Sequence, residues 1–141
     1  MKKLISLIVA AIIILLTSCN ITSNPNSIVG NWWSVPEEEE KDHVYLSISE
    51  DMTFRCWVFN NHYSEITDDM VPNYSGHVEY KNGKMKLKID EIDDIILALV
   101  MDQNKPQELY LDKNNILTMK FHIIIDKISK SHLFHLRKVE N

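Results

Sequence analysis

Hydrophobic and polar residues alternate most regularly in residues 74–90, where the pattern predicts a β-hairpin. Asn82-Gly83 lies at its centre and is the dipeptide most typical of a two-residue type I′ turn. Such a turn fixes the register, and alternation then puts the apolar side chains on one face and the lysines on the other. The predicted opposite pairs are Lys81 with Lys84, Tyr80 with Met85, Val78 with Leu87, and Gly76 with Ile89.

A second hairpin is predicted for residues 108–125, and the faces of its strands decide the length of its loop. A two-residue loop would place Leu109 opposite a threonine, whereas a three-residue loop at residues 113–115 places it opposite Met119. Asn115 can adopt the left-handed backbone conformation that such a loop requires. We therefore predict the three-residue loop.

Four further segments show the alternation of strands: residues 28–35, 43–48, 53–59 and 132–139. Short strands separated by polar turns are typical of a β-barrel or a β-sandwich. Closing the sheet also removes the exposed edges of an open meander. We therefore predict an all-β fold in which an antiparallel meander of about eight strands closes into a small barrel, with room for one short helix.

Residues 91–101 fit two structures. Their apolar positions have the i, i+3, i+4, i+7 and i+8 spacing of a helix, with Asp90 as a candidate cap. Residues 95–101 are also an unbroken apolar run, which suits a strand that is buried on both faces. We favour the strand because every neighbouring element is predicted to be a strand.

The N-terminus has the pattern of a secretion signal. Lys2 and Lys3 precede an apolar run over residues 4–16, which as a helix is about 20 Å long and too short to cross a bilayer. The sequence Leu16-Thr17-Ser18-Cys19 resembles the lipobox of bacterial lipoproteins at all four positions. The resemblance implies transfer of a diacylglyceryl group to the Cys19 thiol, cleavage before Cys19, and acylation of the new amino terminus by a fatty acid such as palmitate.

The lipobox divides the chain into a signal peptide (1–18), a lipidated cysteine with a flexible tether (19–27) and a barrel domain (28–141). Two or more acyl chains hold a protein stably on a membrane, so we expect a lipid-anchored protein of the cell envelope. Asn20 is not the aspartate associated with inner-membrane retention in some bacteria, which favours the outer membrane. The alternative is an ordinary N-terminal membrane anchor with an incidental cysteine.

Composition excludes several classes of protein. The formal net charge is −5, and it falls to −7 without residues 1–18, which hold two lysines and no acidic residue. A nucleic-acid-binding protein needs a basic surface, so no nucleic-acid partner is expected. The chain has two cysteines, which rules out a scaffold held together by disulfides. If Cys19 is lipidated, Cys56 is the remaining free thiol, and we expect it to be buried.

Residues 28–139 together resemble the small lipocalin-like domains of bacterial lipoproteins. Gly30-Asn31-Trp32 opens the first strand and matches the G-x-W signature of lipocalins. In lipocalins an arginine near the end of the barrel stacks on the signature tryptophan, and the resemblance assigns this role to Arg137. An arginine over an indole ring contributes about 0.5–2 kcal/mol. The resemblance implies a lipocalin-like β-barrel but no particular ligand.

An eight-stranded barrel is just wide enough to be filled by side chains or to hold one small ligand. The side chains expected inside are bulky, which favours a packed core over a cavity. Trp57 and Phe59 lie on the outer face of their strand, next to a long polar loop that holds Tyr63. They either contact a ligand or partner, or pack beneath that loop. The candidate ligand-binding residues are Phe54, Trp57, Phe59, Tyr80, Met85, Phe121 and Phe134.

Sequence motifs for catalysis are missing: there is no G-x-S-x-G, no Walker-type glycine loop, no H-E-x-x-H and no C-x-x-C. His132 and His135 are three residues apart on a predicted strand, so they point to opposite faces. His62 with the acidic residues of its loop lacks the spacing of a metal motif. The acidic run at residues 37–40 fits an exposed loop. We therefore expect no enzyme, no metal and no cofactor.

Two functions remain. The first is non-enzymatic binding of a small apolar ligand or an envelope component inside the barrel. The second is a protein-interaction or accessory module with a solid barrel whose loops make the contacts. An enclosed lumen of roughly 300 Å³ or more would favour the first, and a filled lumen with an exposed aromatic patch of several hundred Å² would favour the second. The oligomeric state does not follow from the sequence.

Overall fold

The computed structural model describes residues 24–34, 43–59, 66–67 and 69–140. The predicted signal peptide, Cys19, the acidic run at 37–40, His62 and Tyr63 lie outside these residues. The elements are η1 (Pro25–Ile28), β1 (Gly30–Ser34), β2 (His43–Ile48), β3 (Thr53–Phe59), β4 (Tyr74–Lys81), β5 (Lys84–Ile92), α2 (Ile95–Val100), β6 (Gln107–Leu111), β7 (Ile116–Ile125) and β8 (Ile128–Lys138).

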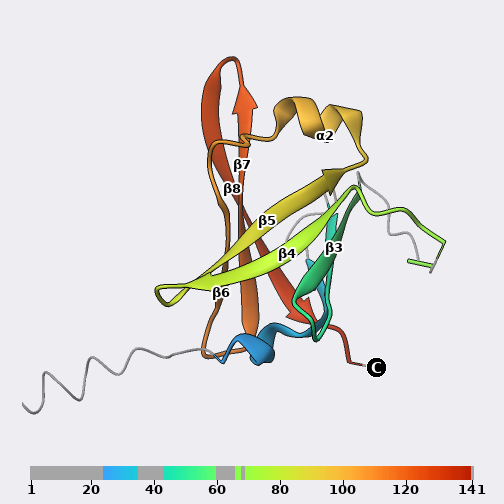
Figure 1. The fold of residues 1–141 in the computed structure, drawn as a ribbon, viewed down its shortest axis with the longest axis vertical. Coiled ribbons are helices and arrows are strands. Elements are labelled where there is room, and N and C mark those ends of the chain that lie inside the picture. The colour runs from blue at the N-terminus through green and yellow to red at the C-terminus, as the bar shows by residue number, and fades with distance from the viewer. Residues whose placement is uncertain (1–23, 35–42, 60–65, 68, 141) are drawn as a thin grey trace, which may run out of the picture.

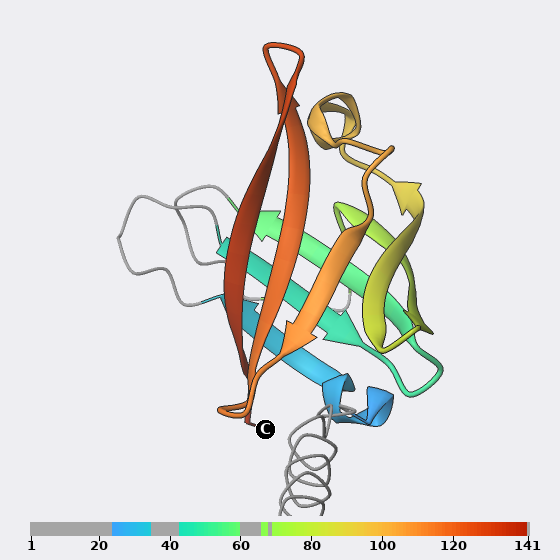
Figure 2. The same ribbon diagram turned by 90° about the vertical axis from the view of Figure 1, so that its left-hand side faces the viewer.

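The eight strands form a closed antiparallel barrel in the order of the sequence (Figures 1 and 2). Each strand pairs with the next, and β1 pairs with β8 to close the sheet. The predicted all-β barrel is therefore confirmed. The 3-10 turn η1 lies at one end of the barrel, and Pro25 to Ser27 of the predicted tether belong to it. Among the described residues, no helix is long and apolar enough to cross a bilayer.

Both predicted hairpins have the predicted register. Tyr80 lies opposite Met85, and Asn82 and Gly83 have φ of 54° and 73°, as a type I′ turn requires. Leu109 lies opposite Met119 across the three-residue loop. In this loop Asn115 has a φ of 58°.

Residues 95–101 are not the strand that we favoured: residues 95–100 form the short helix α2. Asp94, and not Asp90, caps the helix, and its Oδ1 accepts hydrogen bonds from the backbone N–H groups of Ile96 and Leu97 at 2.9 and 3.1 Å. Asn73 donates to the other carboxylate oxygen at 2.9 Å. These bonds satisfy N–H groups that are otherwise left free at a helix start, and the helix begins where β5 ends.

The last strand is longer than predicted. It begins at Ile128 instead of His132 and forms a hairpin with β7 through a two-residue turn at Asp126-Lys127. Both turn residues have positive φ, 52° and 64°, although neither is glycine, so the sequence gives no strong turn signal. The hairpin projects beyond the rest of the barrel, beside α2 (Figure 2).

Candidate functional site

Side chains fill the interior of the barrel. The ring centroids of Phe54 and Tyr74 are 5.9 Å apart, and those of Tyr74 and Phe121 are 6.0 Å apart. The Tyr74 hydroxyl donates to the sulfur of Met119 at 3.6 Å. Four of the predicted ligand-lining residues take part in this packing: Phe54, Met85 and Phe121 are buried in the core, and Phe134 is half-buried against it.

Tyr80 does not line the interior. It shares a face with Met85, as predicted, but its side chain is 41% exposed whereas Met85 is 4% exposed. The pair lies next to the turn, where the β4–β5 hairpin extends past the body of the barrel (Figure 1). Alternation gives the face of a residue correctly, but it does not give the point at which the core ends.

The signature residue Trp32 is fixed at the barrel end that holds η1. Its indole Nε1 donates to the Ile28 carbonyl at 2.8 Å, and the side chain is 1% exposed. The side chain of Lys138 covers the ring, with Nζ 5.7 Å from the ring centroid. Gly30 makes room for this lysine, because a Cβ at residue 30 would lie 2.8 Å from Lys138 Cε.

The prediction that Arg137 stacks on Trp32 is wrong. Arg137 lies opposite Trp33, and Lys138 lies opposite Trp32. Directly opposite residues share a face, so the cation over the indole is the lysine one position later.

The outer face of β1–β3 carries a cluster of rings. Trp33 lies at its centre. The centroid of its ring is 5.8 Å from that of His43, 5.6 Å from that of Tyr45 and 6.0 Å from that of Phe59. Tyr45 in turn contacts Trp57 at 5.7 Å. At these centroid distances, each aromatic pair stabilises a fold by about 0.5–1.5 kcal/mol.

Trp57 is buried although it lies on the outer face. It is 3% exposed, its Nε1 donates to the Met70 carbonyl at 3.3 Å, and the guanidinium carbon of Arg55 lies 4.9 Å from its ring centroid. The segment before β4 therefore covers Trp57. Of the two alternatives for Trp57 and Phe59, packing is the one that these contacts support.

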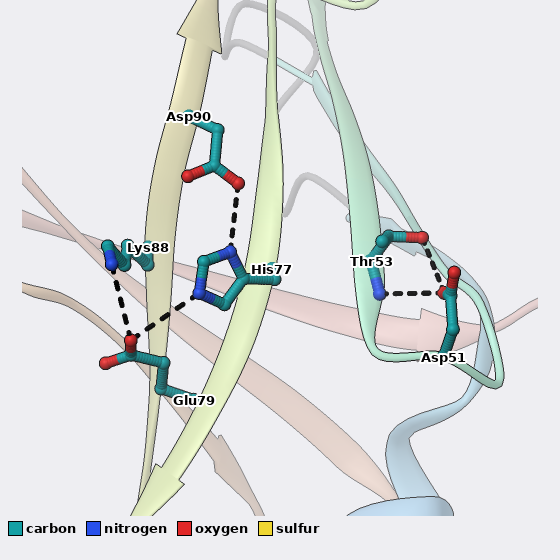
Figure 3. Close-up of polar contacts among 6 residues, drawn as sticks. All are labelled: Asp51, Thr53, His77, Glu79, Lys88 and Asp90. Atoms are coloured by element: carbon teal, nitrogen blue, oxygen red, sulfur yellow. Dashed lines mark hydrogen bonds and ion pairs between the residues drawn. The ribbon is translucent and has the colours of Figure 1, made fainter.

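A cluster of charged side chains lies on the outer face of β4 and β5 (Figure 3). His77 Nδ1 is 2.9 Å from Asp90 Oδ2, and its Nε2 is 3.5 Å from Glu79 Oε1, which also lies 3.7 Å from Lys88 Nζ. All four side chains are more than a third exposed. Exposed ion pairs of this kind contribute little to stability, because water and salt screen them.

Two reactive side chains among the described residues, Cys56 and His122, have shifted pKa values. Burial raises the pKa of the Cys56 thiol to about 12, so it is protonated at neutral pH and is a poor nucleophile. Burial, with the nearby Lys120 and Lys105, lowers the pKa of His122. Within the described ranges, no three His, Cys, Asp or Glu side chains are grouped to hold a metal ion.

An open cleft lies where β5 separates from β6. The two strands pair only between Met85–Leu87 and Gln107–Leu109. Beyond Leu87, β5 separates from the segment that leads into β6 and leaves a cleft of about 570 Å³, which we call the seam cleft. Its apolar lining residues are Leu87, Ile89, Ile92 and Met101, and its lysines are Lys86, Lys88 and Lys105.

The most unusual surface lies at the end of the barrel opposite η1, where α2 and the tip of the β7–β8 hairpin lie side by side (Figures 1 and 2). Three side chains of α2 point into solvent: Ile95 is 78%, Ile96 74% and Leu99 78% exposed. On the hairpin, Ile125 is 40% and Ile128 61% exposed. We call these five residues the distal patch.

The sequence pattern does not predict the distal patch, because the apolar run at 95–101 also suits a buried strand. Ile125 and Ile128 lie opposite each other and share the face of Ile123, which packs on the core and pairs with Met101 at the end of α2. The inner face of the hairpin therefore continues past the core toward the helix. Asp94, directly before the run, was the sequence signal that a helix begins there.

Comparisons with known proteins leave the family open. No model of a known protein family matches the chain, and no curated protein sequence matches it.

Proposed function

We propose that this chain is a lipid-anchored protein of the cell envelope whose solid barrel is a non-enzymatic interaction module. Its binding surface is the distal patch. The observation that carries the proposal is the exposure of three large apolar side chains on one short helix, about three-quarters each. Contiguous apolar side chains on a folded surface mark interaction sites, because leaving them in water is unfavourable.

The filled interior supports this function over ligand binding in the lumen. Phe54, Met85 and Phe121 are each at most 6% exposed and belong to one continuous core. A ligand in the lumen would have to displace them, and each lost core contact costs stability. The distal patch, in contrast, is available without any rearrangement.

The lipid anchor is proposed because residues Leu16–Cys19 resemble a lipobox. In the proposed mature protein, which begins at Cys19, the chain reaches the barrel through η1. This turn lies at the end of the barrel opposite the distal patch (Figure 1). The patch therefore faces away from the point of attachment. Replacing Cys19 with Ser should move the protein from the membrane to the soluble fraction, and a variant that still sediments with membranes would refute the anchor.

Site-specific photo-crosslinking in cells tests the interaction surface. A benzoylphenylalanine in place of Ile96 should give an adduct of higher mass when the full chain is irradiated. The matched control places the same group at Lys113, in the exposed loop between β6 and β7 near η1. Equal adducts at both positions, or none at Ile96, would contradict the proposal.

A second candidate function is binding of a small apolar ligand in the seam cleft. The observation that favours it is the group of four apolar residues, Leu87, Ile89, Ile92 and Met101, inside a cleft of about 570 Å³. This volume is within the range of small-molecule sites, about 300–1,000 Å³. Native mass spectrometry of the purified protein tests it, because a bound molecule should be lost when Ile89→Trp fills the cleft and retained in Tyr80→Trp.

A further inference from the structure

We infer that the partner of the distal patch is a second copy of this chain, bound head to head across a two-fold axis. The inference rests on the proposed function, since it names the partner of the same surface. Its basis is that the distal patch has opposite charges at its two ends, so that it is complementary to itself.

The acidic end of the patch is the start of α2. Glu91 at the end of β5 and Asp93 in the connection to α2 are exposed, and the carboxylate of Asp94 caps the helix. The helix runs from this acidic end toward the β7–β8 hairpin (Figure 1). Its three exposed apolar side chains therefore lie between the acidic residues and the hairpin.

The basic end is the tip of the hairpin. Lys127 is in the turn, and Lys130 lies opposite Ile123 on the face that continues toward α2. Both lysines are exposed, and the one acidic residue of the turn is Asp126. The hairpin tip therefore has a surplus of positive charge, whereas the start of α2 has only negative charge.

A two-fold axis requires a surface that fits itself: residue i of one copy meets residue j of the other, and j meets i. An axis through the middle of the distal patch puts the apolar side chains of both copies together. It also puts the acidic start of α2 in each copy opposite the hairpin lysines of the other copy, so that two equivalent charge contacts form. The apolar centre supplies the affinity, and the charges set the orientation and disfavour other pairings.

Other occupants fit the charges less well. An anionic bilayer would be attracted by Lys127 and Lys130 but repelled by Glu91 and Asp93. A different protein would need its own matching pair of acidic and basic groups, and the described residues do not specify one. A second copy brings the matching groups by symmetry.

Disulfide trapping in membranes tests the inference with the full chain. Leu99→Cys places a thiol near the proposed axis, so mild oxidation should give a dimer of twice the monomer mass on a non-reducing gel. Cys56 is buried and cannot take part. Lys113→Cys, far from the patch, is the matched control and should give at least tenfold less dimer.

Charge reversal then tests the self-complementarity. In the Leu99→Cys background, Lys127→Glu with Lys130→Glu should lower the dimer yield at least threefold, and Glu91→Lys with Asp93→Lys should do the same. Co-expression of the two double variants should restore the yield, because each reversed end then faces a reversed end of opposite charge. All four positions are exposed, so the barrel core is unchanged.

The outcomes separate the inference from the proposed function. Equal dimer yields at Leu99→Cys and Lys113→Cys, or no recovery on co-expression, would overturn the head-to-head dimer. If Ile96 photo-crosslinks to a different protein while Leu99→Cys gives no dimer, the interaction surface stands and the second copy is refuted. If Ile96 gives no adduct and Leu99→Cys gives no dimer, both fail.

Discussion

Replacing Leu99 by Gln should leave the free energy of unfolding almost unchanged. Full burial of a leucine contributes about 1.5–3 kcal/mol, but Leu99 is 78% exposed, so folding hides only about a fifth of it. The expected loss is therefore below about 0.7 kcal/mol. Leu and Gln have similar helix propensities, so α2 itself is not weakened.

Leu136→Ala is the matched control, because this leucine is 0% exposed. Removing a buried leucine costs about 2–5 kcal/mol. Urea unfolding followed by tryptophan fluorescence, at a protein concentration low enough to prevent self-association, measures both values. If Leu99→Gln lost more than about 1.5 kcal/mol, the helix would be part of the core, and the distal patch would not be a free surface.

Three further predictions test local geometry. Gly76→Ala should lower the free energy of unfolding in urea by more than about 3 kcal/mol, because its Cβ would lie 1.9 Å from the Lys88 carbonyl oxygen. Gly83→Ala is the control: its Cβ would lie in open space, so it should lower stability by only about 1–2 kcal/mol, for its positive φ of 73°. Cys56 should resist thiol reagents at pH 8 and react only on unfolding. Its pKa is raised to about 12 in the folded protein, so its contribution to stability is greatest below about pH 8.5, where the unfolded thiol is still protonated. That contribution falls as the pH rises toward 12. Lys138→Ala should quench or shift the fluorescence of Trp32 and lower stability by about 0.5–2 kcal/mol, and an unchanged emission spectrum would show that the lysine does not cover the ring.

The barrel could be predicted because its turns and its strand patterns agree. Asn82-Gly83 and Asn115 fix the registers of the two central hairpins, and the positions opposite each other are then given by counting. The closure of β1 on β8 followed from the strand count and the need to pair the edges. These elements obey local rules, so one sequence was enough.

The candidate site could not be predicted in the same way. The apolar run at 95–101 satisfies the rules for a buried strand, while its helical spacing and the cap at Asp94 favour a helix, so pattern alone does not decide between them. The extra length of β8 depends on a turn at Asp126-Lys127 without glycine, which no turn rule selects. Exposure of an apolar side chain is a tertiary property, because it depends on whether another element is present to cover it.

The proposed lipid anchor and the distal patch together limit how two copies can meet in the proposed dimer. From Cys19 to the start of η1 at Pro25 the chain has about six residues, which span at most about 20 Å. The distal patch lies at the far end of a barrel whose β8 has 11 residues, or roughly 36 Å of strand. A head-to-head dimer puts the two η1 turns at its outer ends, so both anchors can reach one bilayer only if the barrels lie along its surface. If the barrels instead stood upright, copies in one membrane could not join their distal patches, and disulfide trapping at Leu99→Cys would need two apposed membranes. Trapping in isolated vesicles, diluted until they no longer touch, separates these arrangements. If the proposed anchor is correct, the dimer should persist in the dilute vesicles, because a short tether to the lipid would keep each barrel at its own bilayer.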